Sequence, residues 1–284
     1  MERTTIVLEQ FHGVALTHVA GIVSPDFWSD TPHSHDHCEI FIHLAGQMEV
    51  FVEQNRYRLA GGEIRVYRSG ELHCGKSDFE AEMEWYQISL PHAFFLQEEN
   101  NSLAPVLFAR EAGEGNVFFS LAAEEMATLL AEVFSAHAAG NPRLPHYAES
   151  AVRRILCLLN EPRHNRPVSA RQDRALGRIL DVVNASFRQI STVAELSDAT
   201  HYSVSYLNRI FKEQMDITPY RFLTAKKLNE AKKALLGGCT VTEACEYAGF
   251  NNYSNFITLF RKTFHQTPKQ YRARSAVNTG KEPL

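Results

Sequence analysis

The C-terminal half of this 284-residue chain contains an internal repeat, and no other feature constrains the fold as strongly. Residues of one copy recur 49 positions later in chemically similar form. The pairs are Ser205 and Ser254, Leu207 and Phe256, Phe211 and Phe260, Lys212 and Arg261, Thr218-Pro219 and Thr267-Pro268, and Phe222 and Tyr271. A shared register over this length indicates two copies of one supersecondary unit.

Each copy has the pattern of two helices separated by a tight turn. The first helices are predicted over residues 192–198 and 241–247, where apolar residues recur at helical spacing. Gly249 follows the second of these and can adopt the positive φ that a sharp reversal requires. Thr200 occupies the corresponding position in the first copy, so we expect that turn to be made differently. The layout predicts two helix-turn-helix units, whose second helices enter the DNA major groove.

The second helix of each unit has an apolar side and a polar side. Helical spacing predicts that Leu207, Ile210 and Phe211 face inward in the first copy, and Phe256, Leu259 and Phe260 in the second. The candidate DNA-binding residues on the outward side are Ser203, Ser205, Tyr206, Asn208, Arg209 and Lys212, then Asn252, Tyr253, Ser254, Asn255, Thr258, Arg261 and Lys262. Amide, hydroxyl and guanidinium groups hydrogen-bond base edges and phosphates. One such residue alone is typical of a solvated helix face, but the repeated set favours a DNA interface.

The charge distribution supports a polyanionic partner for this half. The net charge of −4 combines 12 basic and 23 acidic residues over 1–170 (net −11) with 17 basic and 10 acidic residues over 171–284 (net +7). A basic half is attracted to DNA, and the acidic half is repelled by it. Residues 219–236 are predicted to form one long helix that carries Lys226, Lys227, Lys232 and Lys233 and joins the two units rigidly.

Residues 172–275 resemble the double helix-turn-helix domain of the AraC/XylS family of bacterial transcription regulators. The resemblance is most specific in Ala248-Gly249-Phe250, Ser254-x-Phe256, Phe260-Arg261-Lys262 and Thr267-Pro268-x-x-Tyr271-Arg272. It implies that Ser205, Asn208 and Arg209 read bases in the first unit, and Tyr253, Ser254 and Asn255 in the second. The family often has arginine where this chain has Thr258. Discrimination by the second unit is therefore expected either to be weaker or to depend on the asparagines and on DNA shape, and Arg209 is expected to carry most specificity.

The N-terminal half begins as a strand-rich region. Short alternating runs over residues 1–110, separated by glycine turns, predict a small antiparallel sandwich or barrel. Two amphipathic helices follow, from about residue 120 to 140 and from 145 to 159, and their apolar stripes suit either intramolecular packing or a dimer seam. Residues 161–171 hold two prolines and no apolar period, which predicts a linker.

Five of the 13 histidines lie between His33 and His73. Residues 33, 35, 37 and 39 share parity, so in a strand His33, His35, His37 and Glu39 would face one volume. His73 follows a turn at Ser69-Gly70 and is expected to return to the same volume from a neighbouring hairpin.

This pattern resembles the two motifs of the cupin barrel, His33-x-His35-x-x-x-Glu39 with Gly46, and Gly62 to Gly70 to His73. Arg68 and Ser77 stand where the second motif usually has proline and asparagine. The resemblance implies a metal site of His33, His35, Glu39 and His73 for Fe, Mn, Ni or Zn. The alternative is that these residues line a metal-free effector pocket, frequently for a sugar, in which Trp85 or Tyr86 stacks on the ring.

Together these features predict an α+β chain of two domains. The expected parts are a cupin-like effector-sensing barrel (1–115), a helical segment that dimerises or packs internally (116–160), a linker (161–171), the double helix-turn-helix domain (172–275) and a tail (276–284). The predicted function is a transcription regulator controlled by a small-molecule effector, with promoter DNA, a second copy and RNA polymerase as partners. A metal-dependent cupin enzyme and an effector-independent regulator remain as alternatives.

The cellular location follows from segments that the sequence lacks. No apolar run reaches the roughly 20 residues of a membrane span, and the N-terminus lacks the apolar core of a signal peptide, so we expect a bacterial cytoplasmic protein without membrane contact. The five scattered cysteines, Cys38, Cys74, Cys157, Cys239 and Cys245, form no C-x-x-C pair and are expected to be reduced thiols.

Overall fold

The computed structural model describes residues 3–9, 13–24, 32–53, 55–77, 80–95, 97–108, 116–168 and 174–278. The chain divides into two compact units, one of residues 1–29 and 34–171, the other of residues 172–284 together with 30–33. The predicted tail lies outside the described residues from 279 onward. No helix of the described ranges is long and apolar enough to span a membrane.

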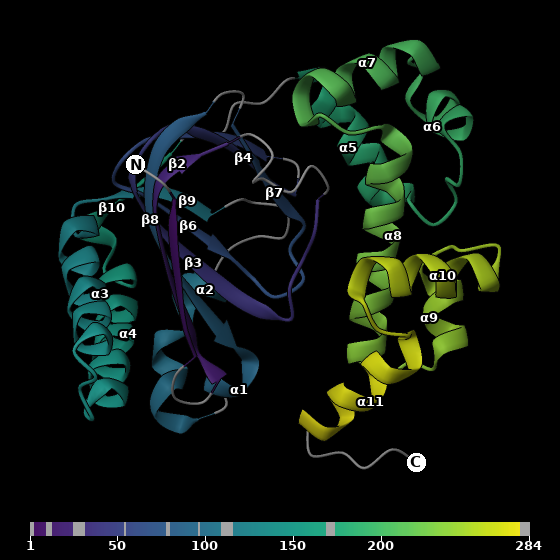
Figure 1. Cartoon of the computed structure of the whole chain (residues 1–284). Helices are drawn as coiled ribbons and strands as arrows, with labels where there is room; N and C mark the ends of the chain where they lie inside the picture. The colour runs from purple at the N-terminus through teal and green to yellow at the C-terminus, as the bar shows by residue number, and fades with distance from the viewer. Residues whose placement is uncertain are drawn as a thin grey trace. The chain divides into compact units, whose positions relative to one another are not determined.

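The first unit is an antiparallel β-structure of two sheets (Figure 1). The larger sheet has the order β1-β2-β8-β3-β6-β9-β10 and the smaller one β5-β4-β7. The strands are β1 (Thr4–Glu9), β2 (Ala15–Val23), β3 (His37–Ala45), β4 (Met48–Val52), β5 (Asn55–Leu59), β6 (Glu63–Tyr67), β7 (His73–Lys76), β8 (Ala81–Pro91), β9 (Asn116–Ser120) and β10 (Asn165–Pro167). The predicted α+β class and cupin-like barrel are confirmed.

Both faces of the larger sheet are buried, so side chains on either face lie in the interior. One face, with Val19, Met83 and Trp85, packs against Val50 and Leu59 of the smaller sheet. The opposite face packs under two helices, α3 (Ala123–Ala138) and α4 (Leu144–Leu159), which lie side by side along it (Figure 1). Short helical segments complete the unit: α1 (His92–Phe95), η3 (Glu98–Leu103), α2 (Pro105–Phe108) and η4 (Pro162–His164).

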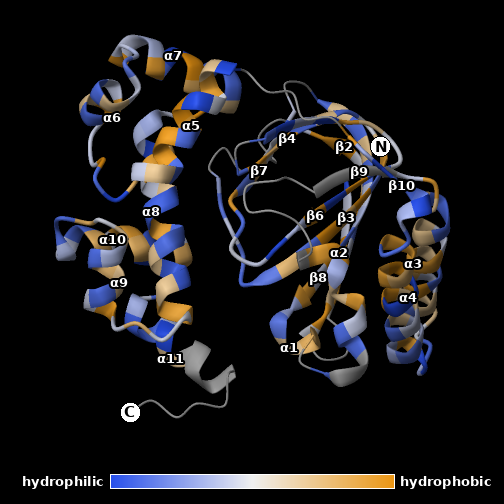
Figure 2. Cartoon of the chain, turned by 180° about the vertical axis from the view of Figure 1, so that it is seen from behind, coloured by the Kyte–Doolittle hydropathy of each residue, from blue (hydrophilic) through white to orange (hydrophobic). Residues whose placement is uncertain are grey.

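The apolar stripes of α3 and α4 are occupied by intramolecular packing. The core that contains residues of the larger sheet also buries Ala148, Val152, Ile155 and Leu156 of α4. Hydrophobic residues run along both α3 and α4 (Figure 2). Of the two predicted uses of these stripes, the described part of the chain therefore shows the intramolecular one.

Two predicted boundaries differ from the structure. Residues 116–120, expected to begin the helical segment, form β9 and belong to the sheet. Residues 165–167, expected in the linker, form β10, which pairs with β9 from Asn165 opposite Ser120 to Pro167 opposite Phe118. The three-residue strand Asn-Arg-Pro has no alternation to reveal it, and the Asn165 side chain fixes it by donating to the Leu159 carbonyl (2.8 Å).

Between residues 174 and 278 the second unit consists of helices joined by short connections. Its helices are α5 (Arg174–Ser186), α6 (Val193–Thr200), α7 (Val204–Met215), α8 (Pro219–Leu236), α9 (Val241–Tyr247), α10 (Tyr253–Phe264) and α11 (Pro268–Asn278). A core of Leu228, Ala244, Phe256, Phe260 and Tyr271 joins α8 to α9, α10 and α11. Long α8 thus serves as the common support, as predicted for residues 219–236.

Candidate functional site

The first helix-turn-helix unit consists of α6 and α7. Thr192 caps α6, because its side chain accepts from the Glu195 amide while the Glu195 carboxylate accepts from the Thr192 amide. His201 ends α6 in the left-handed conformation, with φ of 59°. Ser203 then caps α7 by accepting from the Tyr206 amide. The prediction that Thr200 occupies the turn position is therefore corrected, since Thr200 is the last residue of α6 and His201 makes the reversal.

The second unit, α9 and α10, repeats these contacts with one extra residue in the turn. Thr240 and Glu243 form the same capping box, and Asn252 caps α10. In the first helix-turn-helix unit the Ser197 hydroxyl donates to the Tyr202 carbonyl. In the second helix-turn-helix unit the Cys245 thiol contacts the Phe250 carbonyl at the same five-residue spacing. These first helices and turns thus match at an offset of 48, and the reading helices match at 49. The inserted residue is Asn251.

Gly249 is required in this turn for two reasons. Its φ is +73°, and a Cβ built on it would lie 2.2 Å from the Arg188 carbonyl oxygen. The predicted positive φ at Gly249 is confirmed, and the close approach of the α5–α6 connection is a constraint that the sequence pattern did not reveal.

The predicted faces of the reading helices match the structure closely. Leu207, Ile210, Phe211, Phe256 and Phe260 are buried, and Leu259 is half-buried. Tyr206 is half-buried because its ring stacks on Tyr202. The other candidate DNA-binding residues are exposed: Ser203, Ser205, Asn208, Arg209, Lys212, Asn252, Tyr253, Ser254, Asn255, Thr258, Arg261 and Lys262. Both helices therefore present hydroxyl, amide and cationic groups to a ligand.

Intrahelical pairs hold the two cations of α7. The Arg209 guanidinium lies 3.1 Å from both carboxylate oxygens of Glu213 and over the Tyr206 ring. Lys212 is paired with Asp216. Because these pairs are exposed, they add little stability and are easily exchanged for phosphate or base contacts.

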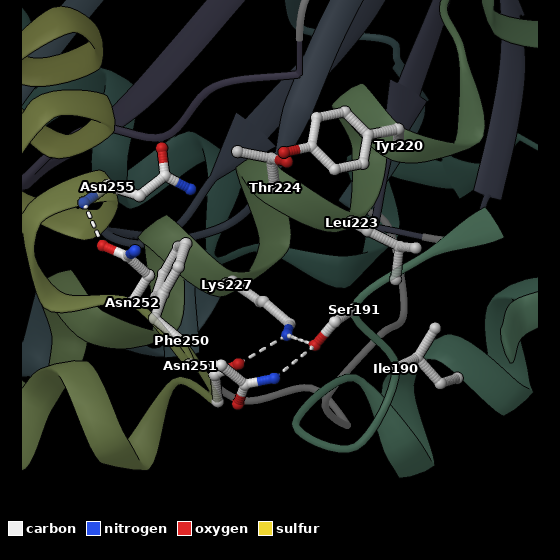
Figure 3. Close-up of a pocket in the computed structure, with 11 residues that line it drawn as sticks. Ile190, Ser191, Tyr220, Leu223, Thr224, Lys227, Phe250, Asn251, Asn252 and Asn255 are labelled. Atoms are coloured by element: carbon white, nitrogen blue, oxygen red, sulfur yellow. Dashed lines mark hydrogen bonds between the residues drawn. The ribbon is translucent and has the colours of Figure 1, made fainter.

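A pocket of about 140 Å³ lies where the two units meet α8, and Lys227 is its central cation (Figure 3). Lys227 is buried, and Nζ donates to the Gly249 carbonyl (2.6 Å) and the Ser191 hydroxyl (3.3 Å). Asn251 donates to the same hydroxyl (3.4 Å). Burial lowers the pKa of Lys227. This lysine thus ties the start of α6 to the turn of the second unit.

The other α8 lysines also differ from simple surface charges. Lys226 and Lys232 are buried, whereas the Lys233 side chain is 41% exposed and pairs with Glu230. Of the four α8 lysines, only Lys233 is therefore exposed.

In the barrel, the histidine cluster surrounds one buried carboxylate. Glu39, at 3% exposure on β3, lies 3.2 Å from Nε2 of His37, 3.3 Å from Nε2 of His35 and 3.5 Å from Nε2 of His73. Its Oε1 also accepts from the Gln87 amide (2.8 Å). Burial by itself would raise the pKa of Glu39, but hydrogen bonds from His37 and His73 and the charge of His35 lower it well below its usual range.

Backbone contacts hold these side chains in place. Gly70, in the predicted turn, donates its amide to the His35 carbonyl (2.8 Å), which fixes the loop before β3. His73 Nδ1 contacts the Glu71 carbonyl (2.9 Å) and therefore carries the proton there, so that Nε2 faces Glu39.

The four ligands predicted from the motif fall into two overlapping groups, with one addition, and neither group holds His33 together with Glu39. Ring nitrogens of His33, His35 and His73 lie within 4.8 Å of one another, as do ligand atoms of His35, His37 and Glu39. His37 is the residue that the predicted set omitted, although its parity with Glu39 was the available signal.

The two aromatic candidates face opposite sides of the larger sheet. Trp85 is buried between the sheets with Val19 and Met83. Tyr86 packs on the helix-covered face, where its ring stacks on His18 at 4.3 Å. Tyr86 is therefore removed from the predicted interior pocket, and Trp85 remains.

The interior also contains two polar residues that the sequence analysis missed. Arg65 on β6 is 2% exposed, and its guanidinium lies 4.1 Å from the Phe41 ring centroid. His43 on β3 is fully buried, and its Nε2 contacts the Gly46 carbonyl (3.0 Å). Burial and the nearby Arg65 charge lower the pKa of His43 to about 4, so this ring is neutral at pH 7.

Comparison with known proteins agrees with both halves of this geometry. A family model described as "AraC-like ligand binding domain" matches residues 24–156, and one described as "Helix-turn-helix domain" matches residues 196–274. The chain belongs to the AraC family. It is an AraC-type DNA-binding transcription regulator with a ligand-binding domain, as the motifs of both halves predicted.

Individual relatives of this AraC-family chain are distant. A probable transcriptional regulator, LumQ of Photobacterium leiognathi, is 26% identical over 257 residues, which cover 86% of this chain and 92% of LumQ. An uncharacterized HTH-type transcriptional regulator of Staphylococcus aureus is 30% identical over 101 residues, but these span only 14% of its length. The crystal structure of the AraC-like transcriptional activator CuxR covers 86% of this chain at 10% identity, with a TM-score of 0.39 and 85% of its own chain aligned.

Proposed function

We propose that a small-molecule effector, a sugar or related metabolite, binds inside the barrel and controls the affinity of α7 and α10 for promoter DNA. The observation that carries this proposal is the polar interior of the barrel. His43 Nδ1 and two nitrogens of Arg65 are buried and have no partner at hydrogen-bond geometry among the described residues, and Glu39 Oε2 is contacted only by Nε2 of His35 and of His73, at 3.3 and 3.5 Å. Buried polar atoms without partners are costly, and a bound polar ligand supplies the missing hydrogen bonds.

On the DNA side, the proposal assigns roles to exposed residues. Asn208 and Arg209 of α7, and Tyr253, Ser254 and Asn255 of α10, read base edges. Lys212, Arg261 and Lys262 contact phosphates. Ser203 and Asn252 already cap their helices through side-chain oxygens, so their contribution is to orient the helix N-termini, whose amides suit phosphate.

The proposed control is a population shift. An effector changes DNA affinity only by the difference between its affinities for the DNA-competent and DNA-incompetent states. Two copies of the chain on properly spaced half-sites would make this shift steeper, and RNA polymerase is the partner that converts DNA occupancy into transcription.

A divalent metal ion is a second proposed occupant, supported by the orientation of His73. With its proton on Nδ1, His73 directs the Nε2 lone pair toward Glu39, an arrangement that repels unless a proton or a cation lies between them. The donor set of His33, His35, Glu39 and His73, with His37 beside it, fits Fe, Mn, Ni or Zn. A bound ion would supply a positive centre for an effector oxygen.

Thermal unfolding of the full chain separates the two occupants. The chain is screened against sugars and related metabolites with and without chelator, and each stabilising compound is then tested in a gel-shift assay on DNA selected from a random library. Stabilisation that survives chelation and changes DNA affinity supports the effector proposal. Compounds that stabilise the chain and leave DNA affinity unchanged contradict it.

The metal proposal has its own control. Chelation should lower the melting temperature of the wild type and leave that of His73→Gln unchanged, whereas the exposed His92→Gln should behave as the wild type does. An equal effect of chelator on the wild type and His73→Gln contradicts a metal at this cluster.

A further inference from the structure

The guanidinium of Arg65 is a buried cation whose surroundings leave one edge unused. Its Nη1 donates to the Met48 sulfur (3.4 Å), and Phe41 stacks against its plane. Nε and Nη2 make no hydrogen bond of ordinary geometry with any described residue; the Tyr67 side chain is the neighbouring polar group, and it and the charge of Glu39 offset part of the cost of burying the cation. Among the described residues, no carboxylate lies within ion-pair distance of Arg65, since Glu39 is engaged by three histidines and Gln87.

The unused atoms form one particular edge of the guanidinium. The hydrogens of Nε and of the neighbouring Nη2 point in parallel along the side of the group, and this pair donates two hydrogen bonds to the two oxygens of one carboxylate. The structure therefore leaves free a complete bidentate donor pair rather than two unrelated nitrogens. Tyr67 and Glu39 stabilise this buried cation only in part, and an anion against the donor pair removes the remaining cost of burial.

We propose that Arg65 binds the carboxylate of the effector through Nε and Nη2, so that the ligand is a small hydroxycarboxylate such as a sugar acid. This inference rests on the proposed function, which places an effector in the barrel, and it specifies the chemical class. Met48 and Phe41 hold the guanidinium in the plane that the bidentate pair requires.

Two neighbouring acceptors account for the hydroxyl groups of the ligand. His43 donates from Nε2 to the Gly46 carbonyl, so its Nδ1 carries a lone pair, and that atom is buried without a donor. Its lowered pKa, about 4, keeps this lone pair available at neutral pH. Glu39 Oε2 is the second acceptor, and its protein contacts, with Nε2 of His35 and of His73, are long at 3.3 and 3.5 Å. An anionic group with adjacent hydroxyls matches one cation edge and two acceptors.

The test compares carboxylates with their neutral counterparts in the full chain. Thermal unfolding is recorded with D-gluconate, D-galacturonate, L-lactate and D-glycerate, and with D-glucose, D-galactose and glycerol. At least one carboxylate should raise the melting temperature of the wild type, while its neutral counterpart does not. In Arg65→Met this stabilisation should disappear, with binding weakened about 10- to 100-fold because two charge-assisted hydrogen bonds are lost.

Two further variants keep the test independent of folding. Without ligand, Arg65→Met should melt at or above the wild-type temperature, because the cost of burying the charge outweighs its interactions with Tyr67 and Glu39, and methionine keeps a side chain of similar size. Arg65→Lys keeps the charge but lacks the parallel donor pair, and should bind more weakly than the wild type. Arg58→Met, at an exposed arginine on β5, should retain the full ligand response.

The inference and the proposed function fail separately. The inference is overturned if ligand-free Arg65→Met melts well below the wild type, if no carboxylate stabilises the wild type, or if neutral sugars stabilise the wild type and Arg65→Met equally. In the last case a change in DNA affinity still supports the proposed function. If a carboxylate binds through Arg65 without changing DNA affinity, the inference holds and the proposed function is contradicted.

Discussion

At the residue scale, the backbone of Gly249 limits substitution more than its position in a turn suggests. Gly249→Ala should destabilise the second helix-turn-helix unit by more than about 2 kcal/mol. The new methyl group would clash with the Arg188 backbone, and this clash adds to the strain of a positive φ. Gly238→Ala is the matched control. Gly238 also has a positive φ, +96°, but nothing lies within 4 Å of its Cβ position, so only the smaller strain should appear. Chemical unfolding of both variants measures the difference, and equal losses contradict the clash.

Arg209 and Lys212 should make different contributions to DNA binding, although both are exposed on α7. Arg209→Ala should weaken specific binding by about 1 to 3 kcal/mol and relax base preference. Lys212→Ala should weaken binding to all sequences alike and lower the salt slope by about one. Binding of specific and scrambled DNA at several salt concentrations distinguishes the two. Arg209→Lys, which keeps the charge, should lose base preference and keep the salt slope; neutral Arg209 and Lys212 variants would contradict the assignment.

His43 should make the barrel less stable in mild acid. The pKa of His43 is lowered to about 4 in the folded chain from 6.5. Between these values the unfolded state binds a proton that the folded state does not, so the free energy of unfolding falls as the pH drops from about 6.5 toward 4. The loss attributable to this ring approaches about 3 kcal/mol.

The control for this pH dependence is His43→Gln, which preserves a donor for the Gly46 carbonyl but does not titrate. Melting temperatures of both chains from pH 7.5 to pH 4.5 should converge in acid if His43→Gln is the less stable protein at neutral pH, and cross if the two start equal. Parallel pH profiles for the two chains contradict a buried neutral histidine.

At the element scale, Lys227 links two helix-turn-helix units through α8. Lys227→Met leaves the Gly249 carbonyl without this donor and should destabilise the second unit by about 1 to 3 kcal/mol. Lys233→Met on the same helix removes an exposed lysine and should change the stability by less than about 0.5 kcal/mol. Calorimetry of the three chains checks the order. If Lys227→Met is as stable as Lys233→Met, the buried hydrogen bonds do not support the second unit.

The elements that the sequence predicted best are those with a strong period. Buried Leu207 and Phe211 recur as Phe256 and Phe260, so repeat and amphipathicity indicated the same helices. The repeat did not reveal the insertion of Asn251, because the repeated residue pairs, from Ser205 and Ser254 onward, all lie after the turn. Strand β10 was missed because Asn-Arg-Pro carries neither alternation nor β-branched residues.

The barrel interior was predicted only in part, for a physical reason. The cupin-like spacing identified His33, His35, Glu39 and His73, but Arg65 lies in Glu-Ile-Arg-Val-Tyr, where alternation with Ile64 and Val66 is typical of a solvent-facing arginine. In this sheet both faces are covered, so the apolar residues pack under α3 and α4 and Arg65 points between the sheets. Alternation of apolar and polar residues specifies the two faces of a strand but does not indicate whether the second face is exposed to solvent.

At the scale of the whole molecule, the described hydrophobic cores are separate. The cores under α3 and α4 and between the sheets contain only residues of the first unit, and the core of α8 to α11 contains only residues of the second. Residues 172–284 should therefore fold without the barrel and retain both reading helices.

Removing the barrel should also change how DNA binding depends on salt. Residues 171–284 carry a net charge of +7, whereas the whole chain carries −4, because the barrel half contributes −11. At low salt the 172–284 fragment should bind non-specific DNA more tightly than the full chain. This advantage should shrink as salt screens the long-range repulsion between the acidic half and DNA, whereas direct phosphate contacts from Lys212 and Arg261 give both proteins a similar contact number. Fluorescence anisotropy across a salt series measures both effects, and a compound that alters DNA binding of the full chain through the barrel should leave the fragment unaffected. Equal affinities at low salt would mean that the acidic half does not act on DNA electrostatically, and a fragment that still responds to the compound would place the effector site outside the barrel.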